Sequence, residues 1–197
     1  PLNVFPSCSS EVTNFAERSD LLFVGGFNHP PNADGLRWFC QEIFPELKTH
    51  CPGIQLHIVG SNMPEEIKSL DGDGIKVHGF LSDEALTELY QQVRASIVPL
   101  RFGAGVKGKV LEAMFHGIPV FTTTIGAEGV PNADAALFIA DDAASFAHNL
   151  ATYYSDLQAL QNKSKLASKV INEHFTYEAV SQVLAQHFIP PRESESL

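Results

Sequence analysis

The segment from residue 95 to residue 123 constrains the fold more than any other part of the sequence. A β-branched strand is predicted at Ala95–Val98, and a second strand at Pro119–Thr123. Between them lie a glycine-rich loop and a helix that ends at His116-Gly117. A helix that connects two neighbouring strands is typical of a right-handed crossover between parallel strands. The segment therefore favours an α/β fold with a parallel sheet.

The same alternation of strands and helices runs through most of the chain. Short apolar runs that end near glycines or turns predict four further strands, at Leu21–Gly25, Gln55–Val59, Ile75–His78 and Leu137–Ala140. Amphipathic patterns predict helices at Asn32–Phe44, Pro64–Leu70, Asp83–Val93, Ala143–Tyr154, Asp156–Glu173 and Thr176–Phe188. The predicted fold is a Rossmann-like, doubly wound parallel sheet of about six strands, with helices at the C-terminal end.

Composition indicates one globular domain. The chain has 197 residues, of which 44% are hydrophobic and 18% charged, so it can bury a good core. We expect residues 1–20 to be a linker or trailing segment, residues 21–189 to form the domain, and residues 190–197 to be a flexible tail. Because the sequence starts at Pro1 in a loop-like stretch, we also expect it to be part of a longer protein.

Charge and cysteine content narrow the classes of partner. The net charge of -10 argues against a nucleic-acid partner. No apolar run approaches the ~18 residues of a membrane span. The three cysteines have no metal-like spacing, so free thiols in a reducing compartment are the simplest interpretation. We expect a cytoplasmic protein without a metal or cofactor.

The loop before the helix at residues 108–116 has the features of an anion site. Its glycines let the backbone approach a ligand, and the helix N-terminus offers unpaired N–H groups. The charged side chains of this segment are Arg101, Lys107, Lys109 and Glu112. A carboxylate beyond the loop could accept hydrogen bonds from a ribose diol. The pattern fits a nucleotide diphosphate, but it equally fits a tight turn followed by an ordinary Lys109–Glu112 surface pair.

Other loops are predicted to meet this one. Ligands of doubly wound sheets bind at the carboxyl ends of the strands. The loops expected at that edge carry Gly25-Gly26, Gly79-Phe80, residues 103–109 and the Gly126–Gly129 turn. Their convergence favours a site whatever its ligand.

Three other motifs in the sequence do not support the functions that their patterns would suggest. A Walker A pattern from Gly103 to Lys109 fails at Val110, where Ser or Thr should hold magnesium. V-G-G-F-N-H after the first strand lacks the dinucleotide pattern G-x-G-x-x-G. Asp71-Gly72-Asp73 fits a plain turn better than a metal motif.

The segment from Leu100 to Val120, which matches L-R-x-G-x-G-x-K-x-K-V-L-E-A-M-x-x-G-I-P-V, resembles a known family. It is similar to the C-terminal, donor-binding domain of GT-B glycosyltransferases of group 1, or GT4-like, type. F-V-G-G-F-N-H-P-P-N, H-G-F and G-A-E-G support the match, which covers about residues 21–188. The resemblance implies one half of a GT-B fold, acting on a nucleotide-sugar donor without a metal.

The resemblance also implies roles for individual residues. Glu112 would bind the ribose of the donor. The diphosphate would be bound by Lys107, Lys109, Arg101, Gly103, Ala104 and Gly105. The nucleobase would lie near His78, Gly79 and Phe80. Further donor contacts are expected at Gly25, Gly26, His29, Gly126 and Glu128.

Two positions depart from the family's pattern. Ala104 stands where many members have the first Glu of E-x7-E, and Gly26 stands where many have Arg. The motif therefore does not identify which residues contact the donor sugar.

The expected function is transfer of a sugar from a nucleotide-diphosphate donor with retention of configuration. A missing N-terminal domain would bind the acceptor, and any contact with the inner face of the membrane would be made through it. The alternatives are a nucleotide-sugar epimerase on the same fold and a non-catalytic sugar-nucleotide-binding domain.

Overall fold

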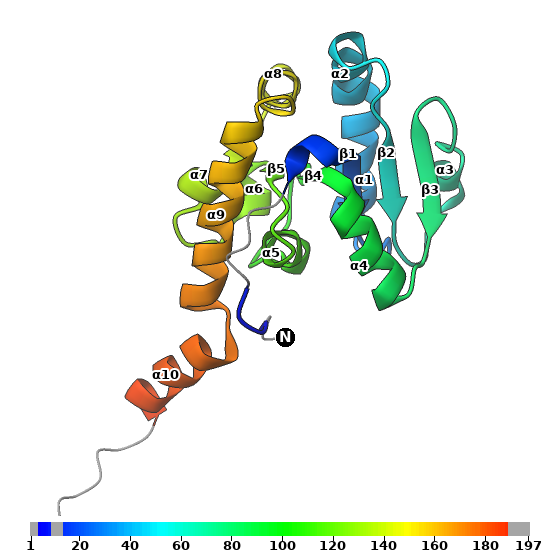
Figure 1. Ribbon diagram of the computed structural model, residues 1–197. Coiled ribbons are helices and arrows are strands. Elements are labelled where there is room, and N and C mark those ends of the chain that lie inside the picture. The colour runs from blue at the N-terminus through cyan, green and yellow to red at the C-terminus, as the bar shows by residue number, and fades with distance from the viewer. Residues whose placement is uncertain (1–3, 9–13, 189–197) are drawn as a thin grey trace, which may run out of the picture.

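The computed structural model describes residues 4–8 and 14–188, and within them the strands form one parallel sheet (Figure 1). Its order is β3-β2-β1-β4-β5-β6, and every neighbouring pair is parallel. The strands are β1 Ser19–Val24, β2 Leu56–Val59, β3 Ile75–Gly79, β4 Val93–Val98, β5 Val120–Thr122 and β6 Phe138–Ile139. The predicted Rossmann-like α/β fold is confirmed. The strand order reverses between β1 and β4, where such sheets bind ligands.

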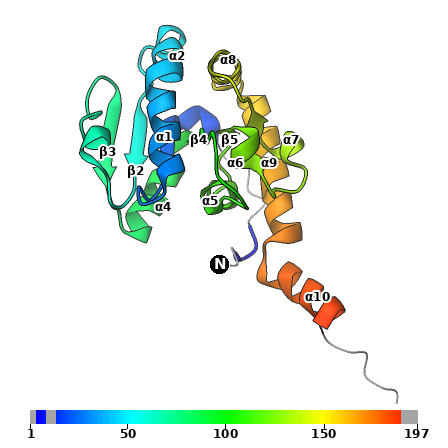
Figure 2. The ribbon, with the colours of Figure 1, turned by 180° about the vertical axis from the view of Figure 1, so that it is seen from behind.

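Helices cover both faces of the sheet (Figures 1 and 2). They are α1 Pro30–Trp38, α2 Phe44–His50, α3 Glu65–Lys68, α4 Asp83–Gln92, α5 Gly108–Phe115, α6 Thr124–Ala127, α7 Ala133–Ala136, α8 Ala143–Tyr153, α9 Leu157–His174 and α10 Tyr177–Phe188. Leu21 and Phe23 of β1 belong to one apolar cluster with residues of α1, α2 and α8, whereas Leu22 belongs to a second with residues of α4, α5 and α9. This alternation is the two-residue period of a strand buried on both faces.

The first helix differs from its prediction. It begins at Pro30 instead of Asn32, because proline is well tolerated in the first turn of a helix. The predicted helix is also interrupted by the π turn η2 at Phe39–Ile43, after which the chain continues as α2 beyond Phe44. Pro45 follows this π turn and has no N–H to donate, which fits the widened backbone there.

Other boundaries shift because pairing partners decide them. Val93 was expected to end a helix, but it is extended and pairs with Ser19 as the first residue of β4.

The expected turn at Gly126–Gly129 is partly the one-turn helix α6, which Thr123 caps by accepting from the Gly126 N–H. The short helix α7 was not predicted.

The described part of the segment expected to be a linker packs against the domain. Ser19 and Asp20 lie in β1, and Phe15, in the short 3-10 helix η1 at Phe15–Glu17, is buried. The Phe5 ring stacks on Phe115 with centroids 5.0 Å apart. The expected tail at residues 190–197 lies outside the described residues.

Two predictions about composition can be compared with the structure. All three cysteines are free thiols. Among the helices of residues 4–8 and 14–188, none is both long and apolar enough to cross a membrane.

Candidate functional site

The carboxyl edge of the sheet is closed by contacts that only glycine allows. A Cβ on Gly60, after β2, would lie 1.8 Å from the carbonyl oxygen of Gly25, after β1. A Cβ on Gly35 of α1 would lie 2.3 Å from the carbonyl oxygen of Pro99, after β4. Both distances are far below contact, so the ends of β1, β2 and β4 are packed backbone against backbone. The loops that follow them have little freedom to separate.

The loop between β4 and α5 leads into a helix N-terminus that no side chain caps. Gly103 and Gly105 have φ angles of +127° and +77°, which favour glycine. Lys107 is the N-cap residue of α5 and makes no capping hydrogen bond with its side chain. The first turn of α5 therefore has the positive dipole end and free donor geometry that suit an anion.

Lys109 lies in the first turn of α5 and reaches across to β1 and α1. Its Nζ donates to Oδ1 of Asn32 at 2.5 Å and lies 4.7 Å from the centroid of the Phe23 ring. A Cβ on Gly25 would lie 2.6 Å from the same Nζ. Burial lowers the pKa of Lys109 to about 7, against a smaller upward effect of Glu112. The ammonium is thus held in a tight site with a neutral partner.

The other two cations of the segment pair with carboxylates. Arg101 makes a bidentate pair with Asp34 of α1, with Nε–Oδ2 and Nη2–Oδ1 distances of 2.8 and 2.6 Å. Lys107 donates to Oε2 of Glu128 at 3.1 Å and also to the carbonyl oxygen of Gly105. The Arg101 guanidinium holds the pKa of Asp34 below its usual range. Arg101 and Lys107 therefore pair with carboxylates, whereas Lys109 pairs with the neutral amide of Asn32.

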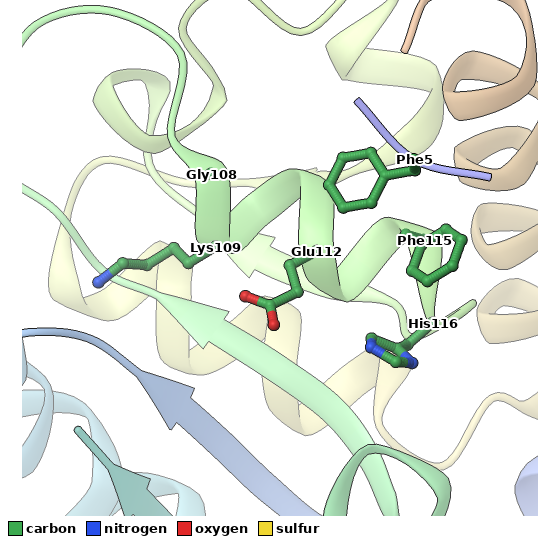
Figure 3. A pocket seen from close by; sticks show the side chains of 6 residues that line it. All are labelled: Phe5, Gly108, Lys109, Glu112, Phe115 and His116. Atoms are coloured by element: carbon green, nitrogen blue, oxygen red, sulfur yellow. The ribbon is translucent and has the colours of Figure 1, made fainter. Parts of the chain in front are cut away.

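Glu112 and Lys109 both line a pocket beside α5 (Figure 3). The pocket measures about 390 Å³ and is lined by Phe5, Gly108, Lys109, Glu112, Phe115 and His116. In Figure 3 the Lys109 and Glu112 side chains leave α5 in different directions, and the described residues include no ion pair between them. Burial raises the pKa of Glu112, and Asp83 adds to the effect. The geometry thus differs from an ordinary surface pair.

The predicted nucleobase region lies at the edge strand. Gly79 ends β3 with φ +73°, and its carbonyl oxygen accepts from the Gly60 N–H at 2.8 Å. Phe80 follows with 77% of its surface exposed. His78 is 2.9 Å from His57, Nε2 to Nδ1, with the two rings stacked, and burial lowers its pKa. The region has an open aromatic face, two strands away from β1.

The remaining predicted contacts lie on both sides of α5. Gly25 is beside Lys109, and the Gly26 carbonyl accepts from Asn32 Nδ2 at 2.6 Å. His29 is exposed at the N-cap of α1. Gly126 is packed so closely that a Cβ would lie 2.0 Å from Thr122 Oγ1. Ala104 lies in the exposed loop.

Sequence reasoning missed three polar residues of the site. Asn32 is only 6% exposed, and Asp34 binds Arg101. Tyr90 of α4 is buried, stacks on His116, and has the one buried side-chain polar atom without a partner in residues 4–8 and 14–188. Asn32 is the last residue of the P-P-N stretch, but its partner Lys109 lies 77 residues further along the chain, so no local pattern in the sequence indicates their contact. The same described residues contain no group of three or more His, Cys, Asp or Glu able to hold a metal.

Comparison with known sequences finds one family model and a curated relative. The family model described as "Glycosyl transferases group 1" matches residues 18–156. An "Uncharacterized 44.6 kDa protein in cps region" of Klebsiella pneumoniae is 33% identical over 164 residues. The match covers 79% of this chain and 42% of that relative, so the chain spans less than half of its length.

Solved structures with a similar fold include several glycosyltransferases. TarM of S. aureus, in a complex with UDP, superposes with a TM-score of 0.73 at 11% identity, over 91% of this chain and 36% of its own. HepE of Anabaena with UDP-glucose gives 0.66 at 17%, over 87% and 49%. The C-terminal domain of a group 1 family protein, LpcC of Francisella tularensis, gives 0.62 at 14%, over 87% and 96%. At these identities the likeness concerns the fold alone.

Proposed function

The chain belongs to the group 1 glycosyltransferases, and from this premise we propose that it binds the nucleotide-diphosphate sugar from which such an enzyme transfers a sugar. The resemblance of residues 100–120 to this family supports transfer with retention of configuration. UDP and UDP-glucose in the similar TarM and HepE structures support a donor of this class.

The observation that carries the proposal is the environment of Lys109. Its ammonium lies at the carboxyl edge between β1 and β4, beside an uncapped helix N-terminus and a glycine loop. A cation held among apolar groups with only an amide acceptor is costly unless an anion compensates it. A diphosphate is the anion that both the cation and the helix N–H groups fit.

Glu112 is the ribose ligand in this proposal. It lies almost one helical turn beyond Lys109, and its carboxylate reaches a pocket large enough for a sugar ring. When the bond to the transferred sugar breaks, negative charge grows on the leaving diphosphate. Lys109 and the N–H groups of α5 stabilise that charge in place, without a metal ion.

The acceptor belongs to a part of the protein beyond this chain. The chain covers 42% of its curated relative and 96% of the LpcC C-terminal domain, which supports a position in the C-terminal half of a longer protein. We propose that an N-terminal domain binds the acceptor and makes any contact with the inner membrane face, and that the whole enzyme is cytoplasmic. The isolated chain then binds donor but transfers poorly.

Thermal unfolding with UDP, GDP, ADP and CDP tests donor binding. One nucleotide should stabilise the wild type, by about 2.7 kcal/mol at 100 times its Kd. Glu112→Ala should lose most of this stabilisation because the ribose loses its acceptor. Glu88→Ala, an exposed change on α4, is the matched control and should keep it. The stabilisation should persist in EDTA, because no metal takes part.

Two results would contradict the proposed function or its catalytic part. If none of the four nucleotides at millimolar concentration stabilises the wild type, this chain does not bind a nucleotide donor and the proposal is wrong. If one binds but the enzyme with its N-terminal domain transfers no sugar from the matching donor, the non-catalytic alternative is correct.

A further inference from the structure

Asn32 connects three segments of the site through one amide. Its Nδ2 donates to the Gly26 carbonyl at 2.6 Å, and its Oδ1 accepts from Lys109 Nζ at 2.5 Å. The two contacts together fix which way the amide points, since the Gly26 carbonyl can accept only from its NH₂ group and the ammonium can donate only to its oxygen. Asn32 is 6% exposed, so both bonds are shielded from water.

The neutral partner distinguishes Lys109 from the other cations of the segment. Arg101 and Lys107 each contact a carboxylate, from Asp34 and Glu128. No carboxylate within residues 4–8 and 14–188 makes an ion pair with Lys109. An amide can orient an ammonium without neutralising it, whereas a carboxylate in the same place would compete with an anionic ligand.

We propose that Asn32 is a positioning residue, which aims the Lys109 ammonium at the donor's diphosphate while leaving its charge unpaired. This rests on the proposed function, because it takes the diphosphate as the ligand of Lys109. Asn32 touches neither donor nor reacting atoms. It acts through Lys109, and Gly25 leaves the room that the ammonium needs, since a Cβ there would lie 2.6 Å from Nζ.

The arrangement couples donor binding to a proton. The groups that face Lys109 are Asn32 from α1, and Phe23 and Gly25 from β1 and its loop. Glu112, on its own helix, points another way but still raises the pKa of Lys109 through its charge. Because its pKa is lowered to about 7, the free protein loses this charge above neutral pH. A bound diphosphate favours the charged form, so binding takes up a proton and weakens as pH rises.

The test replaces the amide by an isosteric acid. Asn32→Asp should raise the pH at which the Lys109 Cε resonance titrates by NMR by about one unit or more. The Kd of the nucleoside diphosphate selected by thermal unfolding should rise about tenfold at pH 7.5. Between pH 7.5 and 9, the wild-type Kd should rise about 20-fold because Lys109 loses its charge, and the variant's Kd should rise less because its Lys109 titrates at a higher pH.

Two further variants keep the test decisive. Asn162→Asp adds the same charge at an exposed position of α9, and should leave the Lys109 titration and the Kd unchanged. Gly25→Ala crowds Nζ without changing any charge, and should weaken binding even if Asn32→Asp fails to fold.

The outcomes separate this inference from the proposed function. If Asn32→Asp shifts neither the titration nor the Kd, or if Gly25→Ala binds as the wild type does where the acid variant does not fold, the positioning role is wrong. If the titration shifts but the wild type binds no nucleoside diphosphate, the contact is real, while the diphosphate role and the proposed function both fall.

Discussion

The loop at residues 101–107 and the first turns of α5 carry the same kind of side chains in different settings. Residues 101–106 of the loop are exposed, and the cations Arg101 and Lys107 are paired with carboxylates. In α5, Lys109 faces an amide and an aromatic ring. Ion pairs near the surface contribute little and exchange readily. Arg101, with 46% of its side chain exposed, is therefore expected to contribute little, whereas Lys109 of α5 is a buried cation that no carboxylate of the described residues pairs with.

The largest effect is expected at the carboxyl edge of the sheet, where the ends of β1 and β2 meet. Gly60→Ala should destabilise the fold by about 3 kcal/mol or more, because its Cβ would lie 1.8 Å from the Gly25 carbonyl oxygen. Gly53→Ala is the matched control, since no atom lies within 4 Å of its added Cβ. Urea unfolding of both variants measures the difference. Equal stabilities would mean that the ends of β1 and β2 are not packed tightly against each other.

The next effect concerns nucleotide affinity. Lys109→Met should raise the Kd of the bound nucleotide about 100-fold, since it removes a charge-assisted contact in a site shielded from water. Calorimetry on the folded variant measures it. A change of less than fivefold would show that α5 does not supply the main charge.

The pH dependence of stability reports on the same ammonium without a ligand. The folded pKa of Lys109, about 7, lies below the unfolded value, so between pH 7 and 9 the unfolded chain holds a proton that the folded chain has lost. Relative to Lys109→Met, the wild type should therefore gain stability as pH rises, by about 2 kcal/mol over this range. Urea titrations at pH 7, 8 and 9 measure the gain. Parallel curves would contradict a buried, unpaired ammonium.

The smallest effects are expected in the loop. Arg101→Met should change the free energy of unfolding by less than about 1 kcal/mol and the nucleotide Kd by less than about fivefold, because Arg101 is exposed and already paired with Asp34. Repeating the binding measurement in high salt should reduce even these differences. A loss as large as that of Lys109→Met would place both regions in the same role.

Much of the fold follows from local patterns. The glycine loop between two apolar strands predicted a parallel crossover, and the same alternation elsewhere predicted the sheet that the structure contains. The boundary at Val93 was wrong because its pairing with Ser19, far away in the chain, outweighs a helical pattern. The π turn before Pro45 was also not predicted, because its hydrogen bonds join residues five apart instead of the four of an α-helix.

The sequence names candidate residues for the site, whose roles stay predictions, but it did not show which of them pair. The motif at residues 100–120 placed Lys109 and Glu112 on one helix, and their spacing allowed an ordinary surface pair. In the structure the two diverge, and Lys109 meets Asn32. The bidentate partner of Arg101 was likewise not visible in the sequence, because Asp34 precedes it by 67 residues.

The sequence by itself determined the order of strands and helices, the glycines at the carboxyl edge and the family to which the chain belongs. These depend on local conformational preferences and on a contiguous motif, which are written along the chain. Only the tertiary structure decided which cations pair with a carboxylate and which one faces an amide. That choice depends on how α1 packs against the end of β4 and the start of α5, since α1 carries both Asn32, which accepts from Lys109, and Asp34, which pairs with Arg101.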